Sequence, residues 1–307
     1  MVKKEIIKFL SSDNKTMINA CKWYSDTNYK AIVQIIHGMV EYIDRYDEFA
    51  TFLANNGFLV IGHDHLGHGL SVINKEDYGY FGKNPSELLV NDMNKLREMF
   101  QDDKPYFMIG HSMGSFLLRK YLAVYGKNLS GAIIIGTGYV EPVVTRFGII
   151  VTNIEGLFKG EKHRSKLLLK LSNGKDYKKF VSDGSDLKRN WLTKDIEIAR
   201  KYYSNPMCSF IFTDNGYKGL FESINYCCKM RNINKIPKKL PILITSGEDD
   251  PVGGMGIGVT KVYNLFNKAK INNVELKIYP NDRHEILNET DRDVVYNDIL
   301  KWLNKRI

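Results

Sequence analysis

The chain has 307 residues, of which 43% are hydrophobic and 26% are charged. This composition excludes intrinsic disorder, a collagen-like repeat and a long coiled coil, and the chain is long enough for a large core. The four cysteines lack the spacing of a zinc site or a disulfide framework, so reduced thiols are expected. The net charge of +9 fits either an anionic partner or a lysine-rich proteome, and no nucleic-acid-binding module is recognisable.

The first thirty residues predict a β-hairpin, with strands at 5–10 and 16–24. Beyond residue 29, short apolar runs alternate with helical patterns. Strands are expected at 31–36, 58–62, 106–109, 132–135, 242–246 and 274–279, and helices near 45–55, 84–100, 113–125, 259–269 and up to 303. Asn84 is expected to cap the helix that begins at Pro85. Uniformly apolar strands alternating with helices predict an α/β fold, with a mostly parallel central sheet covered by helices on both faces.

Residues 138–237 interrupt this alternation, because their pattern is helical and contains no clear buried strand. We interpret them as a helical cap or lid inserted between two parts of one core, 1–137 and 238–307. Within 137–236 there are 18 basic and 10 acidic residues, so most of the net charge lies there. One hypothesis is transient contact of this basic cap with an anionic membrane surface. The favoured alternative is a solvated basic surface above an apolar lining.

No signal-peptide core is recognisable, and no apolar run is long enough to cross a bilayer. The sequence therefore predicts a soluble, cytoplasmic protein.

The sharpest motif is Gly110-His111-Ser112-Met113-Gly114, between a predicted apolar strand and an amphipathic helix. A G-x-S-x-G sequence in that context is typical of a nucleophile on a strained turn, where the helix N-terminus favours negative charge. Gly110 and Gly114 lack side chains, which lets the strand and the helix approach closely. Ser112 is therefore the candidate nucleophile, and a plain loop serine is the alternative.

A serine nucleophile needs a base, and in this arrangement an acid and then a histidine follow the serine along the chain. Only His163 and His284 follow Ser112. His163 lies in a lysine-rich stretch, where a solvated surface histidine is expected. His284 follows the strand 274–279 and a turn, so it is the candidate base. The loop after the strand 242–246 offers three candidate acids, namely Glu248, Asp249 and Asp250.

The tetrahedral intermediate of such a reaction needs backbone N–H donors. Met113 supplies one, and Met39 in the loop His37-Gly38-Met39 is expected to supply the other. A second glycine-rich loop has the composition of a metal site, with His63, Asp64, His65 and His68. Its alternate spacing does not suit a set of metal ligands, so loop bracing is the favoured interpretation, as it is for His37.

Five stretches of the chain together resemble the α/β-hydrolase superfamily, and within it the monoacylglycerol lipase and lysophospholipase-like group of serine-aminopeptidase-type hydrolases. They are His37-Gly38-Met39 with Glu41, Arg45 and Tyr46; Asp64 with Gly67, His68, Gly69 and Ser71; residues 110–114; Asp250-Pro251-Val252; and Arg283-His284-Glu285. The resemblance implies Asp250 as the acid, because Gly-x-x-Asp is the usual arrangement of this loop, with Asp249 as the competing choice. It implies ester hydrolysis through an acyl-enzyme, without a cofactor or a metal.

The resemblance implies a monoacylglycerol or a lysophospholipid as substrate. Alternatives on the same fold are a small-ester esterase and a proline-iminopeptidase-type aminopeptidase, which would need an acidic pocket. A non-catalytic ligand receptor is the remaining alternative. Residues 190–195 are similar to cap segments of bacterial members of the group.

Overall fold

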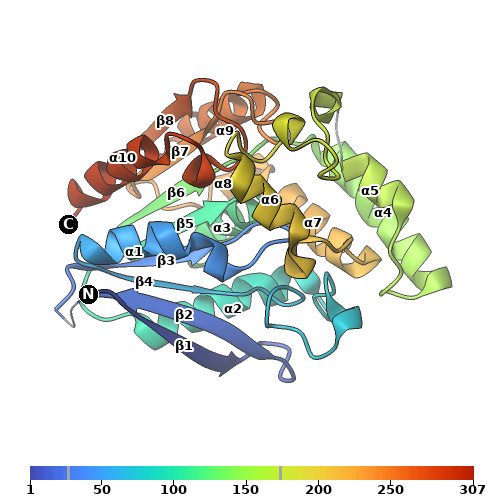
Figure 1. Ribbon diagram of the computed structural model, residues 1–307, viewed down its shortest axis with the longest axis horizontal. Coiled ribbons are helices and arrows are strands. Elements are labelled where there is room, and N and C mark those ends of the chain that lie inside the picture. Colours follow the sequence, from blue (N-terminus) through green and yellow to red (C-terminus); the bar gives the residue numbers. More distant parts are fainter. Residues whose placement is uncertain (26–27, 173–174) are drawn as a thin grey trace.

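The computed structural model describes residues 1–25, 28–172 and 175–307. One eight-stranded sheet crosses the molecule, with the strand order β1-β2-β4-β3-β5-β6-β7-β8 (Figure 1). The strands are β1 (Lys3–Leu10), β2 (Met17–Tyr24), β3 (Ala31–Ile36), β4 (Phe58–His63), β5 (Tyr106–His111), β6 (Gly131–Ile135), β7 (Ile242–Gly247) and β8 (Val274–Tyr279). β1 and β2 pair antiparallel, as do β2 and β4, whereas the strands from β3 to β8 pair in parallel. The predicted α/β fold with a mostly parallel sheet is therefore confirmed.

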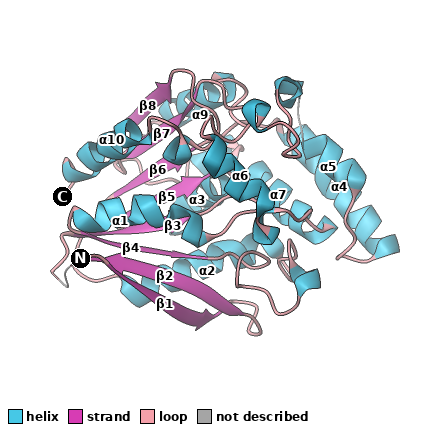
Figure 2. Ribbon diagram, in the orientation of Figure 1, coloured by secondary structure: helices cyan, strands magenta, loops and turns pink. Residues whose placement is uncertain are grey.

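Helices cover both faces of this sheet (Figure 2). They are α1 (Asp47–Asn55), α2 (Pro85–Phe100), α3 (Met113–Tyr125), α4 (Pro142–Lys159), α5 (Lys166–Ser172), α6 (Ile196–Ser204), α7 (Asp214–Cys227), α8 (Met230–Ile233), α9 (Ile257–Lys268) and α10 (Arg292–Asn304). Short 3-10 turns are η1 (Ile43–Tyr46), η2 (Lys75–Asp77), η3 (Lys175–Lys179), η4 (Leu187–Arg189), η5 (Pro206–Cys208) and η6 (Ile286–Asn288). Among the described residues, no helix is long and apolar enough to cross a membrane.

Two hydrophobic clusters, one on each face, explain why the central strands are apolar throughout. In β3, Ile32 and Ile36 pack into the cluster formed with α2, α3 and α9, and Val33 and Ile35 pack into the cluster formed with α1 and α10. Successive side chains of a strand point to opposite faces, so a strand buried on both sides needs apolar residues at every position. This packing fixes the carboxyl edge of the sheet, where the loops after β3, β5, β7 and β8 meet.

The helix α2 begins at Pro85 with Asn84 at the N-cap position, as predicted, but Asn84 bonds to the helix through its backbone and not through its side chain. Asn84 has a φ of 60° and its side chain makes no capping hydrogen bond. Its backbone carbonyl instead accepts the N–H groups of Glu87 and Leu88. A left-handed residue turns its side chain away from the first helical N–H groups, so the turn satisfies them through its carbonyl.

The segment between β6 and β7 contains α4 to α8, and in its described part it has no strand. α4 and α5 lie at one end of the molecule, away from the sheet (Figure 1). By contrast, α7 packs against α2 and α3, and α8 against α3 and α9. The segment is thus anchored on the core by α7 and α8, while α4 extends outward. Its treatment as a separate cap, with the boundaries 138 and 237, stays a prediction.

Candidate active site

Ser112 occupies a strained turn between β5 and α3. Its φ is 54° and its ψ is −120°, a conformation that costs a non-glycine residue about 1–3 kcal/mol. The two motif glycines leave the space that this turn needs. A Cβ on Gly110 would lie 2.5 Å from the carbonyl oxygen of Gly114, and a Cβ on Gly114 would lie 2.2 Å from that of Ile36. The local sequence therefore places the Ser112 side chain above the edge of the sheet, at the start of α3.

His284 and Asp250 form a buried pair on the loops after β8 and β7. Nδ1 of His284 donates to Oδ1 of Asp250 at 2.9 Å, and the two side chains are almost fully buried. Ser246 Oγ and the Val252 N–H also donate to this carboxylate. Burial opposes ionisation of Asp250, but its electrostatic interaction and hydrogen bond with His284 outweigh burial and lower the pKa of Asp250. Nε2 of His284, which has no hydrogen-bond partner among the described residues, is left as an acceptor.

The other two candidate acids form no hydrogen bond with His284 in the described structure. Glu248 and Asp249 are exposed at the surface, whereas Asp250 is buried. The Glu248 carboxylate accepts the backbone N–H of Asn281. The structure thus brings Asp250, and not its two acidic neighbours, to the imidazole.

The two candidate N–H donors lie beside Ser112. Met39 follows β3 and Met113 begins α3, and both line the same cavity as Ser112 and His284. Within the described chain, neither N–H donates to another protein group. Gly38 is packed tightly here, because a Cβ on it would lie 2.9 Å from that of Ser112. The arrangement leaves two free N–H groups next to the serine.

Glu41 organises the loop that carries Met39. Its carboxylate accepts the Gly38 N–H at 2.5 Å and the Tyr46 hydroxyl at 2.9 Å, and it lies 3.1 Å from Nδ1 of His111. Burial opposes ionisation of Glu41, but the hydrogen bond from His111 and the charge of Arg45 hold its pKa well below the ordinary value. His111 precedes Ser112, so one buried carboxylate braces both the loop and the turn.

Arg45 links this loop to the candidate base. Its guanidinium lies 2.8 Å from Glu41 and 2.7 Å from Glu285, the residue after His284, and all three side chains are nearly buried. Glu41, Arg45 and Glu285 belong to the stretches that resemble the hydrolase family, but sequence analysis assigned them no role. Their function as a bridge follows only from the fold.

Hydrogen bonds hold the loop that contains His63, Asp64, His65 and His68 against its neighbours. The His65 N–H donates to Nε2 of His37 at 2.9 Å, and Nδ1 of His68 pairs with the carbonyl of Leu66 at 3.1 Å. Burial lowers the pKa of His63 to about 3 and that of His68 to about 4, so both rings are neutral. This geometry supports loop bracing.

Asp64 from the same loop accepts three hydrogen bonds. The donors are the backbone N–H groups of Ile43 and Leu70 and the side chain of Asn19. Burial raises the pKa of Asp64 to about 6 despite these bonds. Its carboxylate therefore joins the loop to β2 and to η1.

Trp191 is a site residue that sequence reasoning missed. Its indole packs on the imidazole of His284, with ring centroids 4.9 Å apart and the planes 31° from parallel. The segment is docked by its backbone, because the Glu285 N–H donates to the carbonyl of Leu192 and Arg283 donates to that of Asn190. The similarity of residues 190–195 to cap segments of bacterial members was the one available signal, and it gave no indication of this contact.

His163 is not the solvated surface histidine that the sequence predicts. Its side chain is 30% exposed, and Nδ1 donates to Oδ2 of the buried Asp214 at 3.0 Å. The lysine-rich context misled the prediction, because Asp214 is 51 residues away and is brought near only by the packing of α7.

A cavity of about 1140 Å³ connects these groups. Most of its lining is aromatic or aliphatic and comes from the loops of the core and from the segment between β6 and β7. The lining includes Met39, Met113, Phe116, Tyr139, Val144, Trp191, Tyr202, Phe210, Leu220 and Phe221. Such a site suits a largely apolar ligand with one polar, reactive group.

A serine on a strained turn above a parallel sheet, sharing a cavity with a histidine–aspartate pair, defines a protein of the α/β-hydrolase fold. Residues 27–291 match the family described as "Serine aminopeptidase, S33", and the chain belongs to this family. It is 28% identical over 292 residues to a monoglyceride lipase homolog of Monkeypox virus, covering 94% of each chain. It is also 25% identical over 295 residues to a monoacylglycerol lipase of Mycolicibacterium smegmatis, covering 92% of this chain and 90% of the relative.

Comparison with a solved structure also indicates an esterase of this fold. The chain is similar to a thermostable carboxyl esterase from Bacillus coagulans in complex with glycerol, with a TM-score of 0.90 and 28% identity over 99% of this chain and 98% of the esterase. The fold and these relatives place the chain among the esterases and lipases of the α/β-hydrolase fold.

Proposed function

We propose that this protein is a serine carboxylic-ester hydrolase that acts on monoacylglycerol or lysophospholipid. The observation that carries the proposal is the shared cavity, in which Ser112 on its strained turn lies with a His284 bonded to Asp250. The mainly apolar lining suits an acyl chain. The similarity to lipases that are named for monoacylglycerol favours that substrate over lysophospholipid.

The proposed reaction has two steps. Ser112 Oγ bonds to the ester carbonyl carbon while its proton passes to Nε2 of His284, and the Met39 and Met113 N–H groups stabilise the oxyanion. The C–O bond to the alcohol then breaks, and the alcohol leaves with the proton from His284. Water next gives a proton to His284 and bonds to the acyl carbon, and Ser112 leaves with that proton. Asp250 stabilises the imidazolium in both steps.

The test is the initial rate on monoacylglycerols and lysophosphatidylcholines of matched, increasing chain length, with Ser112→Ala as the blank. The proposal expects a clear preference for long-chain monoacylglycerol. Preference for lysolipid would change the head group but keep the chemistry, and preference for the shortest esters would indicate a small-ester esterase. Undiminished hydrolysis by Ser112→Ala would refute the assignment of the nucleophile.

An aminopeptidase needs a carboxylate available to a substrate ammonium group. Three of the five carboxylates that line the cavity are engaged in ion pairs: Glu41 and Glu285 pair with Arg45, and Glu141 pairs with Lys261. Asp176 and Asp183 also line it and form no ion pair among the described residues. These pairs count against the aminopeptidase alternative. Absence of ester hydrolysis, combined with release of an N-terminal residue from peptide arylamides, would favour it.

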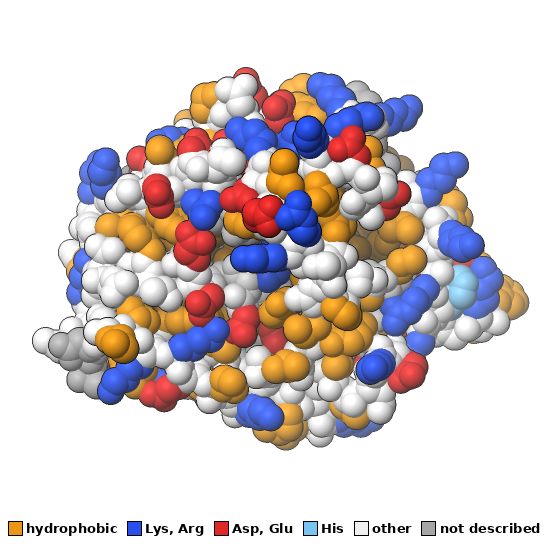
Figure 3. Space-filling model, viewed as in Figure 1, with side chains coloured by type: hydrophobic (Ala, Val, Ile, Leu, Met, Phe, Trp, Pro, Cys, Tyr) orange, Lys and Arg blue, Asp and Glu red, His pale blue; other side chains and the backbone are white. Residues whose placement is uncertain are grey.

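We also propose that α4 contacts a lipid surface when the enzyme takes up substrate. An exposed apolar stripe runs along the helix, and Leu157 and Phe158 are 80% and 81% exposed at its end. The full stripe comprises Val143, Val144, Phe147, Ile150, Ile154, Leu157 and Phe158. Lys and Arg side chains are gathered around this end of the molecule (Figure 3). An amphipathic helix of this kind binds lipid through apolar burial and attraction to anionic head groups.

Flotation with vesicles of phosphatidylcholine, with and without phosphatidylglycerol, tests the lipid contact. The double variant Leu157→Glu/Phe158→Glu is expected to lose binding, because it places two charges on the apolar stripe. Val294→Glu, at an exposed site on α10, is the matched control and is expected to bind as the wild type does. Equal flotation of all three proteins would remove the proposal.

The cytoplasmic location stays a prediction. The four cysteines are free and buried, as expected for a reducing compartment.

A further inference from the structure

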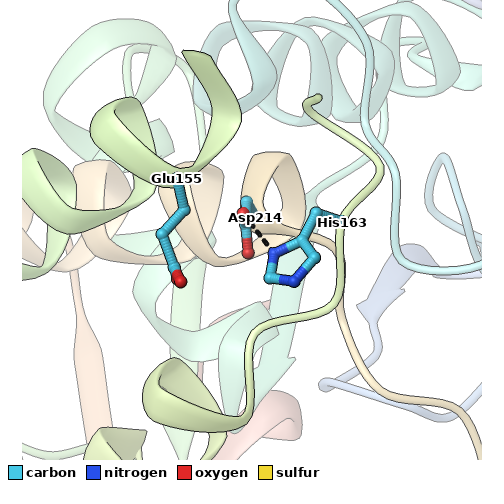
Figure 4. Close-up of side chains that lie close together, drawn as sticks. All are labelled: Glu155, His163 and Asp214. Atoms are coloured by element: carbon cyan, nitrogen blue, oxygen red, sulfur yellow. Dashed lines mark hydrogen bonds and ion pairs between the residues drawn. The ribbon is translucent and has the colours of Figure 1, made fainter. Parts of the chain in front are cut away.

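Three side chains that could hold a metal ion converge between α4 and α7, outside the cavity of Ser112. Glu155 lies on the last turns of α4, His163 in the loop that follows, and Asp214 at the first position of α7. One ligand atom of each residue lies within 4.8 Å of the others, and the three side chains point toward a common space (Figure 4).

Two carboxylate oxygens in this cluster are buried without a hydrogen-bond partner in the described structure. They are Oδ1 of Asp214, whose side chain is only 1% exposed, and Oε2 of Glu155. A buried carboxylate oxygen that has lost water and gained no donor is strongly destabilising. Ser165 lies beside both carboxylates, with its side chain near Glu155 and its backbone near Asp214, and partly compensates them. The two oxygens and the adjacent imidazole nitrogen nevertheless form a candidate cation site.

The backbone holds the cluster in place. The Asp214 N–H donates to the carbonyl of His163 at 2.7 Å, and the Asn215 N–H donates to that of Glu161 at 3.1 Å. These bonds fix the loop after α4 against the first turn of α7. The ligand atoms of His163 and Asp214 are thus presented by a preformed framework.

Among the described residues, no basic side chain bonds to Oε2 of Glu155 or to Oδ1 of Asp214. Lys159 pairs with Oε1 of Glu155 at 2.7 Å, which leaves Oε2 available. Lys162 pairs with Asp77, and Arg164 donates to the carbonyl of Ile211. A cation between Glu155, His163 and Asp214 would share the Glu155 carboxylate with Lys159, whose half-exposed side chain can move into solvent.

We propose that Glu155, His163 and Asp214 bind a divalent transition-metal ion of the zinc class. A mixed set of one imidazole and two carboxylates suits zinc better than magnesium or calcium, which prefer oxygen ligands alone. Ligands on one tetrahedral zinc ion lie about 3.4 Å apart, given bond lengths of about 2.1 Å. The ligand atoms, which lie within 4.8 Å of one another, would therefore have to draw together on binding, and a ligating Nδ1 of His163 would give up the proton that it donates to Asp214. Water would complete the coordination.

The bound ion would act as a structural clamp. α4 and α7 both line the cavity, through Val144 and Thr145 on α4 and Leu220 and Phe221 on α7. A metal ion between their ends would fix the distance between these two walls. Sequence analysis expected no metal, and its one candidate for a metal site was the loop with His63, Asp64, His65 and His68.

Calorimetric titration of the full-length, chelator-treated protein with Zn²⁺ tests the proposal, with Mg²⁺ and Ca²⁺ as comparisons. One equivalent of Zn²⁺ is expected to bind and to raise the melting temperature. Glu155→Gln and Asp214→Asn should each weaken binding at least tenfold, because each removes one charged ligand. Glu161→Gln is the matched control, since it removes an exposed carboxylate from the same loop without touching the cluster.

Absence of Zn²⁺ binding by the wild type would overturn the proposal, and so would equal binding by all variants, which would locate the ion elsewhere. If Asp214→Asn fails to fold, Glu155→Gln, at a partly exposed helical position, decides the question. A crystal soaked in Zn²⁺ should show an anomalous peak within bonding distance of the three residues, and a peak elsewhere would count against it. These readouts do not depend on ester hydrolysis.

Discussion

The indole of Trp191 packs against the imidazole of His284, with 4.9 Å between ring centroids. The Trp191 carbonyl also accepts the backbone N–H of His284, at 3.4 Å. The segment between β6 and β7 thus touches the candidate base directly, through a side chain and through its backbone. This contact makes the orientation of His284 depend on a residue that lies 93 positions earlier in the chain.

Replacement of Trp191 by alanine is expected to lower kcat/KM on a soluble short-chain ester about tenfold. An aromatic contact contributes about 1 kcal/mol, and loss of that amount from the transition state changes a rate by nearly an order of magnitude. Trp191→Phe keeps a ring against His284 and should retain most of the activity. An alanine variant as active as the wild type would show that the stacking has no part in orienting the base.

Asp250→Asn is expected to lower kcat by about 10³–10⁴, because the amide favours the wrong tautomer of His284 and cannot stabilise its cation. Asp249→Asn is the matched control, since Asp249 is exposed and should tolerate the change within about twofold. Steady-state rates of the two variants on one ester settle the choice between the adjacent acids. A greater loss in Asp249→Asn would reverse the assignment.

Ser112→Gly is expected to be inactive and yet more stable than Ser112→Ala, by about 1 kcal/mol in the free energy of unfolding. Alanine keeps the strain of a φ of 54°, whereas glycine adopts that conformation freely. Denaturant unfolding of the two inactive variants measures the difference. Equal stabilities would mean that the turn at Ser112 stores no strain.

Glu41→Gln is expected to destabilise the fold by about 3–5 kcal/mol, because it removes one charge from a buried network. Glu87→Gln is a suitable control, since the Glu87 partner of Lys120 is 60% exposed and its loss should cost less than about 1 kcal/mol. Chemical denaturation at pH 7 compares the two variants. Similar small effects would show that Glu41 is not the centre of the loop that carries Met39.

The effect of Glu41→Gln should also depend on pH. Burial lowers the pKa of His111, but the hydrogen bond and charge of Glu41 raise it more. The pKa of His111 is therefore raised above its ordinary value of 6.5. Stability from this pair is fully present below the unfolded pKa and is lost as pH rises through the folded value. The difference in unfolding free energy between wild type and Glu41→Gln should therefore be larger at pH 6 than at pH 9. A difference independent of pH would mean that His111 stays neutral throughout.

The residue pattern was enough to predict the sheet, because a strand buried on both faces must be apolar throughout and a covering helix must repeat its apolar residues on one side. It also identified the candidate nucleophile, since the turn between strand and helix at Ser112 needs a glycine two residues before it and another two residues after it, at Gly110 and Gly114. His284 was chosen as the candidate base because only His163 and His284 follow Ser112 in the chain. The choice among the acids at 248–250 rested on resemblance alone.

The contacts between side chains that are distant in the sequence became clear from the packing of the elements. Arg45 bonds to Glu285, Trp191 packs on His284, and His163 bonds to Asp214. The two members of each pair are at least 51 positions apart in the sequence. Local sequence encodes the period and the ends of an element, but such contacts depend on how whole elements pack and on the direction of each side chain. The sequence predicted Asn84 as the N-cap residue of α2, but its left-handed backbone and the lack of a side-chain capping bond were visible only in the structure. The bridge to the base and the proposed metal cluster could therefore be found only once α7 and the loops were placed on the sheet.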